Sequence, residues 1–432
     1  MTAAEPPGAG LRRARGRRGA LSFLGFMSSM ALLAAASLVM IPALIDSAGA
    51  HAWGRIAAGQ SVGAIAAVVV AFGWGLAGPA RIARADAEGR RREYRESMIA
   101  KLVIVLPMAA LAAGASWLLG GDHRGLAVLG ALTACSIGLT TNWVFVGLGR
   151  PWVLLVWETL PRAGGTALGI ALMSWGAGAA AGLLAQLAGM LVAFVACSVW
   201  ILAPRAASAR SSIPRRGLRQ VLREQGHGVT SSIVSAGYAS APVILVGLLV
   251  PLVLPAYALL DKVQRQINAA AASYVTVLQG WVPRGEGREL QRRVKLALVV
   301  SAIGCALLAL VLALVAPWLL TWLARGEILP PRTAMVLMAV VVAVNLMESV
   351  TSRACLAALG RIDVVARATA VGSAVGVLLL VAGVLLWGVV GALTGVLAGL
   401  TLRLAIEVLA LRGSRRHSRQ PAPVIDQPTG VA

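Results

Sequence analysis

Apolar residues occur along this chain in long runs, and the runs are separated by short segments rich in Arg, Gly and Pro. A helix that crosses the hydrocarbon core of a bilayer needs about 20 such residues. The runs contain Leu, Ala, Val and Gly without period-two alternation, so they predict membrane helices and not barrel strands. Twelve spans are predicted, at residues 20–45, 55–82, 98–119, 126–148, 153–176, 178–202, 229–250, 255–282, 295–322, 334–359, 364–388 and 390–411.

The boundary between the last two spans is the weakest, because only Trp387-Gly388 and Gly391 interrupt the apolar run. Fusing these spans would leave eleven and would place the C-terminus outside. The basic residues that follow, among them Arg412 and Arg415, favour twelve spans and a cytoplasmic C-terminus.

Landmarks that end spans in the first half of the chain recur in the second half. Gly78-Pro79-Ala80-Arg81 ends the second span, and Pro283-Arg284 ends the eighth. Leu148-Gly149-Arg150 ends the fourth span, and Leu359-Gly360-Arg361 ends the tenth. A repeated six-helix unit is typical of proteins that move a substrate across the membrane.

These patterns predict an all-α polytopic membrane protein, with twelve transmembrane helices in two parallel six-helix bundles around a central cavity. The expected segments are a disordered basic cytoplasmic leader at 1–19, an N-terminal bundle at 20–202, a cytoplasmic linker at 203–228, a C-terminal bundle at 229–411 and a disordered cytoplasmic tail at 412–432. In the linker, Leu218, Val221 and Leu222 share a helical face among arginines. An interfacial amphipathic helix and a solvated charge run both remain open there.

Composition and charge support this prediction. Hydrophobic residues make up 58% of the chain and charged residues 13%, so the bilayer must act as solvent. The net charge of +22 lies mostly in the segments predicted to be cytoplasmic, where arginines face anionic lipids. The basic residues expected outside are Arg55, Arg124, Arg325 and Arg332. This positive-inside distribution predicts a multi-pass protein of the cytoplasmic membrane with both termini inside, and it argues against nucleic-acid binding.

The sequence motifs of several chemical functions are absent from this chain. The chain contains no Gly-Lys dipeptide, so it has no P-loop, and its predicted external loops are short. The four cysteines and four histidines are isolated in sequence, so neither a metal site nor a cofactor is predicted. We therefore do not expect an enzyme.

Ionisable side chains within the predicted spans require an explanation, since each costs about 3 kcal/mol to insert into the membrane. Span 255–282 contains Asp261, Lys262 and Arg265. Asp261 and Arg265 are spaced to pair at i, i+4, which leaves Lys262 as an unpaired cation. We expect this face to line a watery cavity.

Other spans contain similar groups. Glu158 and Arg162, and Arg403 and Glu407, are spaced to form i, i+4 pairs. The candidate cavity cations are Lys262, Arg265, Arg162 and Arg353. The candidate coupling or paired acids are Asp261, Glu348, Glu158 and Asp46. The candidate polar residues of the cavity are Gln60, Ser231, Ser235, Tyr238, Asn268 and Asn345.

Short stretches resemble a known family. They are FGWGLAGPARIARA at 72–85, NWVFVGLGR at 142–150, PAYALLDKVQRQI at 255–267 and WVPR at 281–284. Their order and spacing are similar to those of Wzx-type polysaccharide flippases, within the multidrug/oligosaccharidyl-lipid/polysaccharide exporter superfamily. The resemblance implies alternating-access export of a polyprenyl-diphosphate-linked oligosaccharide for cell-surface polysaccharide synthesis. It also implies a monomer that works with membrane lipids, a polysaccharide polymerase and glycosyltransferases.

Three alternatives remain. Multidrug antiporters of this fold usually need a mid-membrane acid in the first or seventh span, and here Asp46 lies at the rim of the first. Peptidoglycan-precursor flippases are more basic in the first two spans, where this chain has Arg81. A scaffold of envelope assembly that has lost transport is the third alternative.

Overall fold

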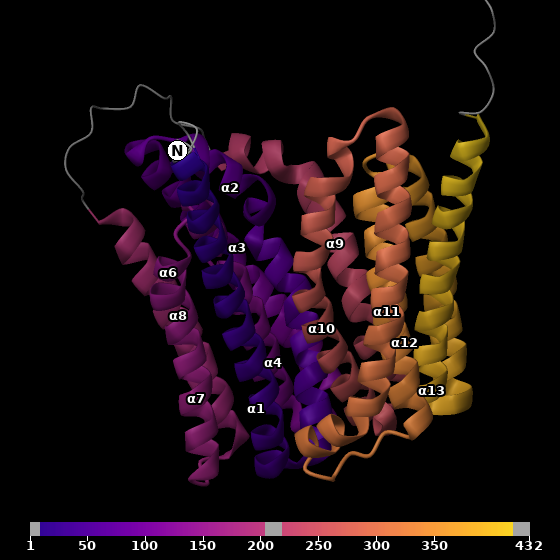
Figure 1. The fold of residues 1–432 in the computed structure, drawn as a ribbon. Coiled ribbons are helices and arrows are strands. Elements are labelled where there is room, and N and C mark those ends of the chain that lie inside the picture. The colour runs from indigo at the N-terminus through magenta and orange to yellow at the C-terminus, as the bar shows by residue number, and fades with distance from the viewer. Residues whose placement is uncertain (1–8, 204–217, 418–432) are drawn as a thin grey trace, which may run out of the picture. The chain divides into compact units, whose positions relative to one another are not determined.

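The computed structural model of this chain describes residues 9–203 and 218–417. Within these ranges every regular element is a helix and none is a strand (Figure 1). A helix satisfies its backbone groups internally, which suits the long apolar runs in lipid. The prediction of an all-α protein is confirmed.

The helices of the first part of the chain are α1 (Ala9–Ala71), α2 (Trp74–Arg84), α3 (Ala87–Leu119), η1 (Gly121–His123), α4 (Arg124–Cys135), η2 (Ser136–Leu139), α5 (Asn142–Leu148), α6 (Pro151–Leu154), η3 (Leu155–Thr159), α7 (Leu160–Ser174) and α8 (Gly178–Leu202). Those of the second part are α9 (Leu218–Leu249), η4 (Pro251–Val253), α10 (Leu254–Trp281), η5 (Val282–Arg284), α11 (Gly287–Leu323), α12 (Arg332–Ser349), η6 (Val350–Leu356) and α13 (Ile362–His417). Of these, η3 and η6 are π-helices, which place an extra residue in one turn.

The chain divides into two compact units. Unit 1 comprises Met1–Gln266, Ala316–Arg332 and Trp387–Val389, and unit 2 comprises Ile267–Val315, Thr333–Leu386 and Val390–Ala432. The division therefore differs from the predicted boundary in the linker at 203–228. The reason is that α9 packs against α1, which places α9 in unit 1.

Helix α1 contains two predicted spans. Gly49 has a φ of +82°, and this left-handed residue separates the first arm of α1 from the second. A second interruption follows at Phe72-Gly73, where both φ angles are positive, and α2 begins after it. Glycine adopts such angles without steric cost, so the sequence places the bend at Gly49.

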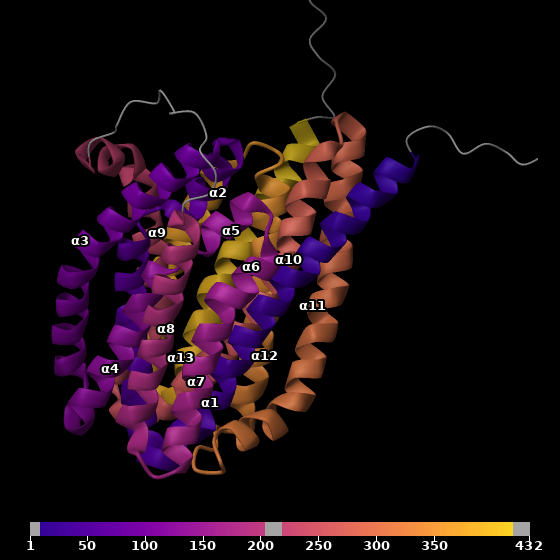
Figure 2. The same cartoon turned by 90° about the vertical axis from the view of Figure 1, so that its left-hand side faces the viewer.

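Close packing of unit 1 depends on glycines that face another backbone. A methyl group at Gly59 or Gly63 would overlap the carbonyl groups of Ala127 and Ala131 on α4. The second arm of α1 and α4 therefore lie side by side and run in the same direction (Figure 2). Small residues of this kind let helix backbones approach within a membrane.

Helices α7 and α8 form an antiparallel hairpin, and their backbones meet at Gly165 with Gly189 and at Gly169 with Gly182 (Figures 1 and 2). The glycine contacts hold the pair together along its length.

Helix α13 forms an antiparallel hairpin of the same kind. The helix breaks at Trp387-Gly388, and its arms meet at Gly383 with Gly391 and at Gly372 with Gly399. The last two predicted spans are thus separate helices, and the eleven-span alternative is wrong.

The outer faces of several helices are apolar and exposed, as expected of surfaces that meet lipid. Leu118 on α3 is 86% exposed, and Trp318 on α11 is 71% exposed. Seven helical stretches of the described residues are long and apolar enough to span a bilayer, and two of these, Leu24–Ala71 and Ile362–Arg412, are the bent helices with two arms each. The chain is an integral, multi-pass membrane protein.

Helix ends differ from the predicted segment boundaries. Helix α1 begins at Ala9, inside the predicted leader, because Arg and Ala both favour helix. Helix α13 likewise continues to His417, inside the predicted tail. Residues 204–217 and the side chains of Leu218, Val221 and Leu222 lie outside the described part, so the choice between an amphipathic helix and a charge run stays open.

Candidate functional site

A first group of charged residues, here called the α10 cluster, joins α10 to α1 and α9. Lys262 Nζ donates a hydrogen bond to Gln60 Oε1 on α1 at 3.2 Å. Arg265 Nε forms the predicted ion pair with Asp261 Oδ2 at 2.6 Å. Arg265 Nη2 also donates to the carbonyl oxygen of Ala239 on α9 at 2.6 Å. Helical spacing places Asp261 one turn before Arg265, which explains this pair.

The α10 cluster keeps one uncompensated positive charge. Among the described residues Lys262 makes no ion pair, since Asp261 is engaged by Arg265. The Arg265 side chain is 35% exposed and that of Asp261 16% exposed, so the cluster lies partly at the surface of unit 1. An anionic group could accept hydrogen bonds from Lys262 without breaking the Asp261–Arg265 pair. Charge-assisted hydrogen bonds of this kind are the strong ones.

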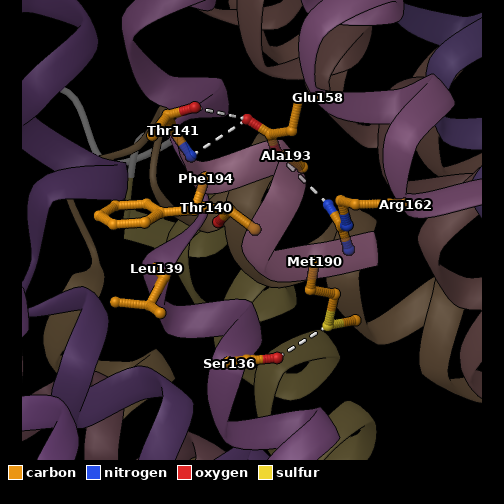
Figure 3. A pocket seen from close by; sticks show the side chains of 9 residues that line it. All are labelled: Ser136, Leu139, Thr140, Thr141, Glu158, Arg162, Met190, Ala193 and Phe194. Carbon is orange, nitrogen blue, oxygen red and sulfur yellow. Dashed lines mark hydrogen bonds and ion pairs between the residues drawn. The ribbon is translucent and has the colours of Figure 1, made fainter. Parts of the chain in front are cut away.

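A second group, here called the α5 cluster, lies around a small pocket in unit 1 (Figure 3). Glu158 Oε2 accepts hydrogen bonds from the backbone nitrogen of Thr141 at 3.1 Å and from its hydroxyl at 2.8 Å. Glu158 Oε1 accepts a hydrogen bond from Arg162 Nη1 at 3.3 Å, so the predicted pair of Glu158 and Arg162 is present. Lys101 Nζ on α3 donates to the carbonyl oxygen of Thr140 at 2.7 Å.

Two helix interruptions produce the α5 cluster. The predicted span 126–148 breaks at Thr140-Thr141, between η2 and α5, which frees backbone groups from helical hydrogen bonds. Glu158 lies in the π-helix η3, and it satisfies the free amide of Thr141. Lys101 satisfies the free carbonyl of Thr140. Glu158 and Lys101 are only 3% and 2% exposed, so each depends on these partners.

Sequence reasoning missed Lys101, although the sequence contains a signal for it. Lys101, Lys262 and Lys295 are the only lysines of a chain that otherwise uses arginine as its basic residue. Lys101 and Lys262 both lie within predicted spans. A buried amine can gain or lose its proton, whereas a guanidinium stays charged, so lysine at these two positions differs chemically from arginine.

A third group, here called the α13 cluster, lies in unit 2. Arg403 Nη2 donates to Glu348 Oε1 on α12 at 2.5 Å and to the Thr369 hydroxyl at 3.2 Å. The predicted pair of Arg403 with Glu407 is therefore wrong. Glu348 holds the guanidinium instead, from the neighbouring helix α12, through a charge-assisted hydrogen bond. Glu407 is fully buried, and neither of its carboxylate oxygens has a hydrogen-bond partner within the described residues.

The other predicted polar residues of unit 2 do not join these ion pairs. Arg353, in the π-helix η6, is exposed, and Asn345 on α12 is half-buried. Asn268 on α10 is half-buried, and its Oδ1 has no hydrogen-bond partner in the described part of the chain.

Asp46 lies in an ion pair at the end of the first arm of α1. Its Oδ2 is 3.0 Å from Arg325 Nε, and the two side chains are 47% and 54% exposed. Glu327, from the same loop as Arg325, accepts a hydrogen bond from the backbone nitrogen of Ala50 at 3.2 Å. Asp46 thus has a partner that spacing in the sequence did not indicate.

The predicted polar stripe of α9 is only partly described. Tyr238 is half-buried and Ser235 is exposed, while the side chain of Ser231 lies outside the described part. Arg162 and Lys262, predicted to line one cavity, belong to two separate clusters of unit 1. Groups of three or more His, Cys, Asp or Glu side chains that could hold a metal are absent from the residues that the structure describes.

Comparison with known proteins identifies the fold. No family model matches the sequence, and no curated protein matches it. The chain is similar to the inward-facing conformation of a multidrug resistance MATE family transporter of the MOP superfamily, with a TM-score of 0.65 over 91% of this chain and 96% of that one, at 16% identity. It is also similar to the eukaryotic MATE transporter AtDTX14, with a TM-score of 0.55 over 95% of this chain and 98% of that one, at 16% identity.

A third similar structure is the outward-facing conformation of a multidrug resistance MATE family transporter of the MOP superfamily. Its TM-score is 0.53 over 92% of this chain and 95% of that one, at 16% identity. These similarities extend over nearly the whole of each chain. The fold of this membrane protein is that of MATE transporters of the MOP superfamily.

Proposed function

We propose that this chain is a flippase that moves a polyprenyl-diphosphate-linked oligosaccharide across the cytoplasmic membrane by alternating access. The observation that supports it is the uncompensated charge of Lys262 on α10, within the predicted span 255–282. Such a charge is costly in a membrane, and it is tolerated where it faces a water-filled cavity, a backbone carbonyl or a group of opposite sign. A diphosphate headgroup is anionic and offers several acceptor oxygens, while its lipid tail can remain in the bilayer.

The balance of charges in unit 1 agrees with an anionic substrate. In the α10 and α5 clusters, Lys262, Arg265, Lys101 and Arg162 are basic, whereas Asp261 and Glu158 are the only acids. Both acids are paired with arginines, so the positive charge that remains belongs to lysines. A cationic drug would be repelled by this surplus.

Multidrug antiport is the second candidate, because the similar solved structures are of multidrug resistance transporters. Asp46 argues against a mid-membrane coupling acid in the first span, since it pairs with Arg325 in an exposed position. Flipping of a peptidoglycan precursor and a scaffold without transport are further alternatives. The former would use the same diphosphate chemistry, so the sugar of the substrate must be determined by experiment.

A flipping assay in proteoliposomes tests the proposal. The probe is a fluorescent polyprenyl-diphosphate-linked oligosaccharide, and a membrane-impermeant quencher reports which leaflet holds it. We expect Lys262→Gln to lower the rate by roughly tenfold, as the loss of one charge-assisted hydrogen bond predicts. Lys262→Arg should retain most of the rate, and Lys295→Gln should retain all of it, because Lys295 is exposed at the start of the predicted span 295–322.

Two results would refute the proposal. One is a normal rate in Lys262→Gln, and the other is equally fast movement of an analogue whose headgroup is uncharged. Transport of an organic cation by the same proteoliposomes, unchanged in Lys262→Gln, would favour the multidrug antiporter. Purified protein that moves none of these probes, although it is folded, would favour the scaffold.

A further inference from the structure

Glu407 on α13 is a buried ionisable side chain of unit 2. It is 0% exposed, and its two carboxylate oxygens have no hydrogen-bond partner within the part of the chain that the structure describes. Burying a carboxylate without partners costs several kcal/mol, so such a group either binds a cation or gains a proton. The environment of Glu407 decides between these two.

Two charged groups act on Glu407. Arg403 lies one turn earlier on the same arm of α13, and Glu348 lies on α12. Arg403 already donates to Glu348 at 2.5 Å and to Thr369 at 3.2 Å. The guanidinium therefore neutralises one carboxylate, and the second is left without a counter-charge.

Several other polar groups of unit 2 have partners of their own. Arg361 donates to the backbone carbonyl of Ala410 at 2.9 Å. On α10 and α11, the hydroxyls of Tyr274 and Ser301 bond to each other at 2.8 Å. Cys355 of η6 is a buried free thiol in the apolar core to which α10, α11 and α13 contribute.

We propose that Glu407 binds a proton, and that the neutral carboxyl group donates its hydrogen to the free oxygen of Glu348. Protonation makes the α13 cluster neutral, since Glu348 then balances Arg403. A metal cation such as Na⁺ fits less well, because it needs several oxygen ligands and would lie beside the positive guanidinium. The ligand is thus a proton.

The proposed proton site lies close in sequence to an irregular stretch of backbone, the π-helix η6. Glu348 is followed closely by the π-helix η6, which begins at Val350. Arg403 passes over Gly372, where a methyl group would overlap its side chain. Loss of the proton would leave two carboxylates to share Arg403, and π-helices are turns that commonly lie at functional sites. We infer that release of the proton changes the pairing of Arg403 and so couples a proton gradient to transport; this coupling role rests on the proposed function, whereas the binding of the proton does not.

Infrared difference spectroscopy of the purified protein without substrate tests the binding step. We expect a carboxylic acid band near neutral pH that declines as the pH is raised and that is absent in Glu407→Gln. Glutamine has nearly the same shape as the protonated acid, so this variant should fold. The matched control is Glu289→Gln, which should keep the band, because Glu289 pairs with Arg293 at 2.9 Å and is 48% exposed.

Three outcomes would overturn proton binding at Glu407. They are a wild-type protein without such a band, a band that survives in Glu407→Gln, and a band that Na⁺ removes at constant pH. A second measurement tests the coupling role in the proteoliposomes, where a proton gradient should speed flipping by the wild type and not by Glu407→Gln. If the lipid-linked probe is not moved at all, the proposed function fails while the infrared result still stands.

Discussion

Gln60 on α1 accepts a hydrogen bond from Lys262 on α10 at 3.2 Å, so the partner of this cation is a neutral amide. The two residues come from the two predicted halves of the chain. Because an amide satisfies one donor of the ammonium group and leaves its charge intact, the contact orients the lysine without neutralising it.

We expect Gln60→Glu to inhibit flipping of the diphosphate-linked probe about as strongly as Lys262→Gln. A carboxylate at position 60 would form an ion pair with Lys262 and cancel its charge. Gln60→Ala is the matched control, because it removes the hydrogen bond and keeps the charge. The rates are measured in the proteoliposome assay. Equal flipping rates of the Gln60→Glu and Gln60→Ala variants would show that the positive charge of Lys262 does not determine the rate.

Glu158→Ala should destabilise the protein by about 3 kcal/mol, since it leaves Arg162 and the amide of Thr141 buried without their partner. Unfolding of the purified protein in detergent measures this loss. Glu289→Ala removes an exposed partner of Arg293 and should cost less than about 1 kcal/mol. A similar cost for both variants would contradict the structural role of the α5 cluster.

Local spacing was enough to predict some of these contacts. The pairs Asp261–Arg265 and Glu158–Arg162 are both present, because residues four apart on a helix lie on the same face. The apolar runs and their glycine breaks likewise predicted the helices, including the separate arms of α13 at Gly388. These features depend only on neighbours within one or two turns.

Contacts between distant segments could not be predicted in this way. Arg403 has an acid one turn away at Glu407, yet it pairs with Glu348, which is distant in sequence. Lys101 binds a carbonyl that is free because the helix breaks at Thr140-Thr141. The glycine nearest to this break is Gly138, and a single glycine within an apolar run does not by itself predict where a helix ends. Such partners depend on how helices pack, which one sequence does not reveal.

The hairpin of α13 predicts a sharp dependence on residue size. Gly383→Leu should destabilise the protein by about 2 kcal/mol, because even a methyl group there would overlap the carbonyl of Gly391. Gly304→Leu on α11 should be neutral, since open space surrounds that position. Thermal unfolding of both variants in the same detergent provides the comparison. Equal melting temperatures would contradict the close approach of the two arms.

The substitution Glu348→Gln should change the charge of Glu407. Without Glu348, Arg403 is free to pair with Glu407 one turn later, and that pairing favours the ionised form. We expect the infrared band assigned to Glu407 to disappear in this variant near neutral pH. A band that remains unchanged would mean that Arg403 does not control the proton on Glu407.

The charge distribution predicts which loops lie outside. A cysteine at Asp122, in the exposed turn after α3, should react with a membrane-impermeant maleimide added to intact cells. A cysteine at Arg288, at the start of α11, should react only after permeabilisation. The four native cysteines are buried, which keeps the background low. Reaction in the opposite order would reverse the predicted orientation.

Because the chain has only three lysines, the accessibility of each can be measured in the unmodified protein. An amine-reactive reagent has three side-chain targets here, of which Lys295 is exposed, Lys101 is 2% exposed and Lys262 is half-buried. Acetylation followed by peptide mass spectrometry would give Lys295 as the internal standard and Lys101 as the protected reference. The extent of acetylation at Lys262 would then measure how often water reaches α10, and a bound anionic lipid should lower it, in a chain with no residue replaced.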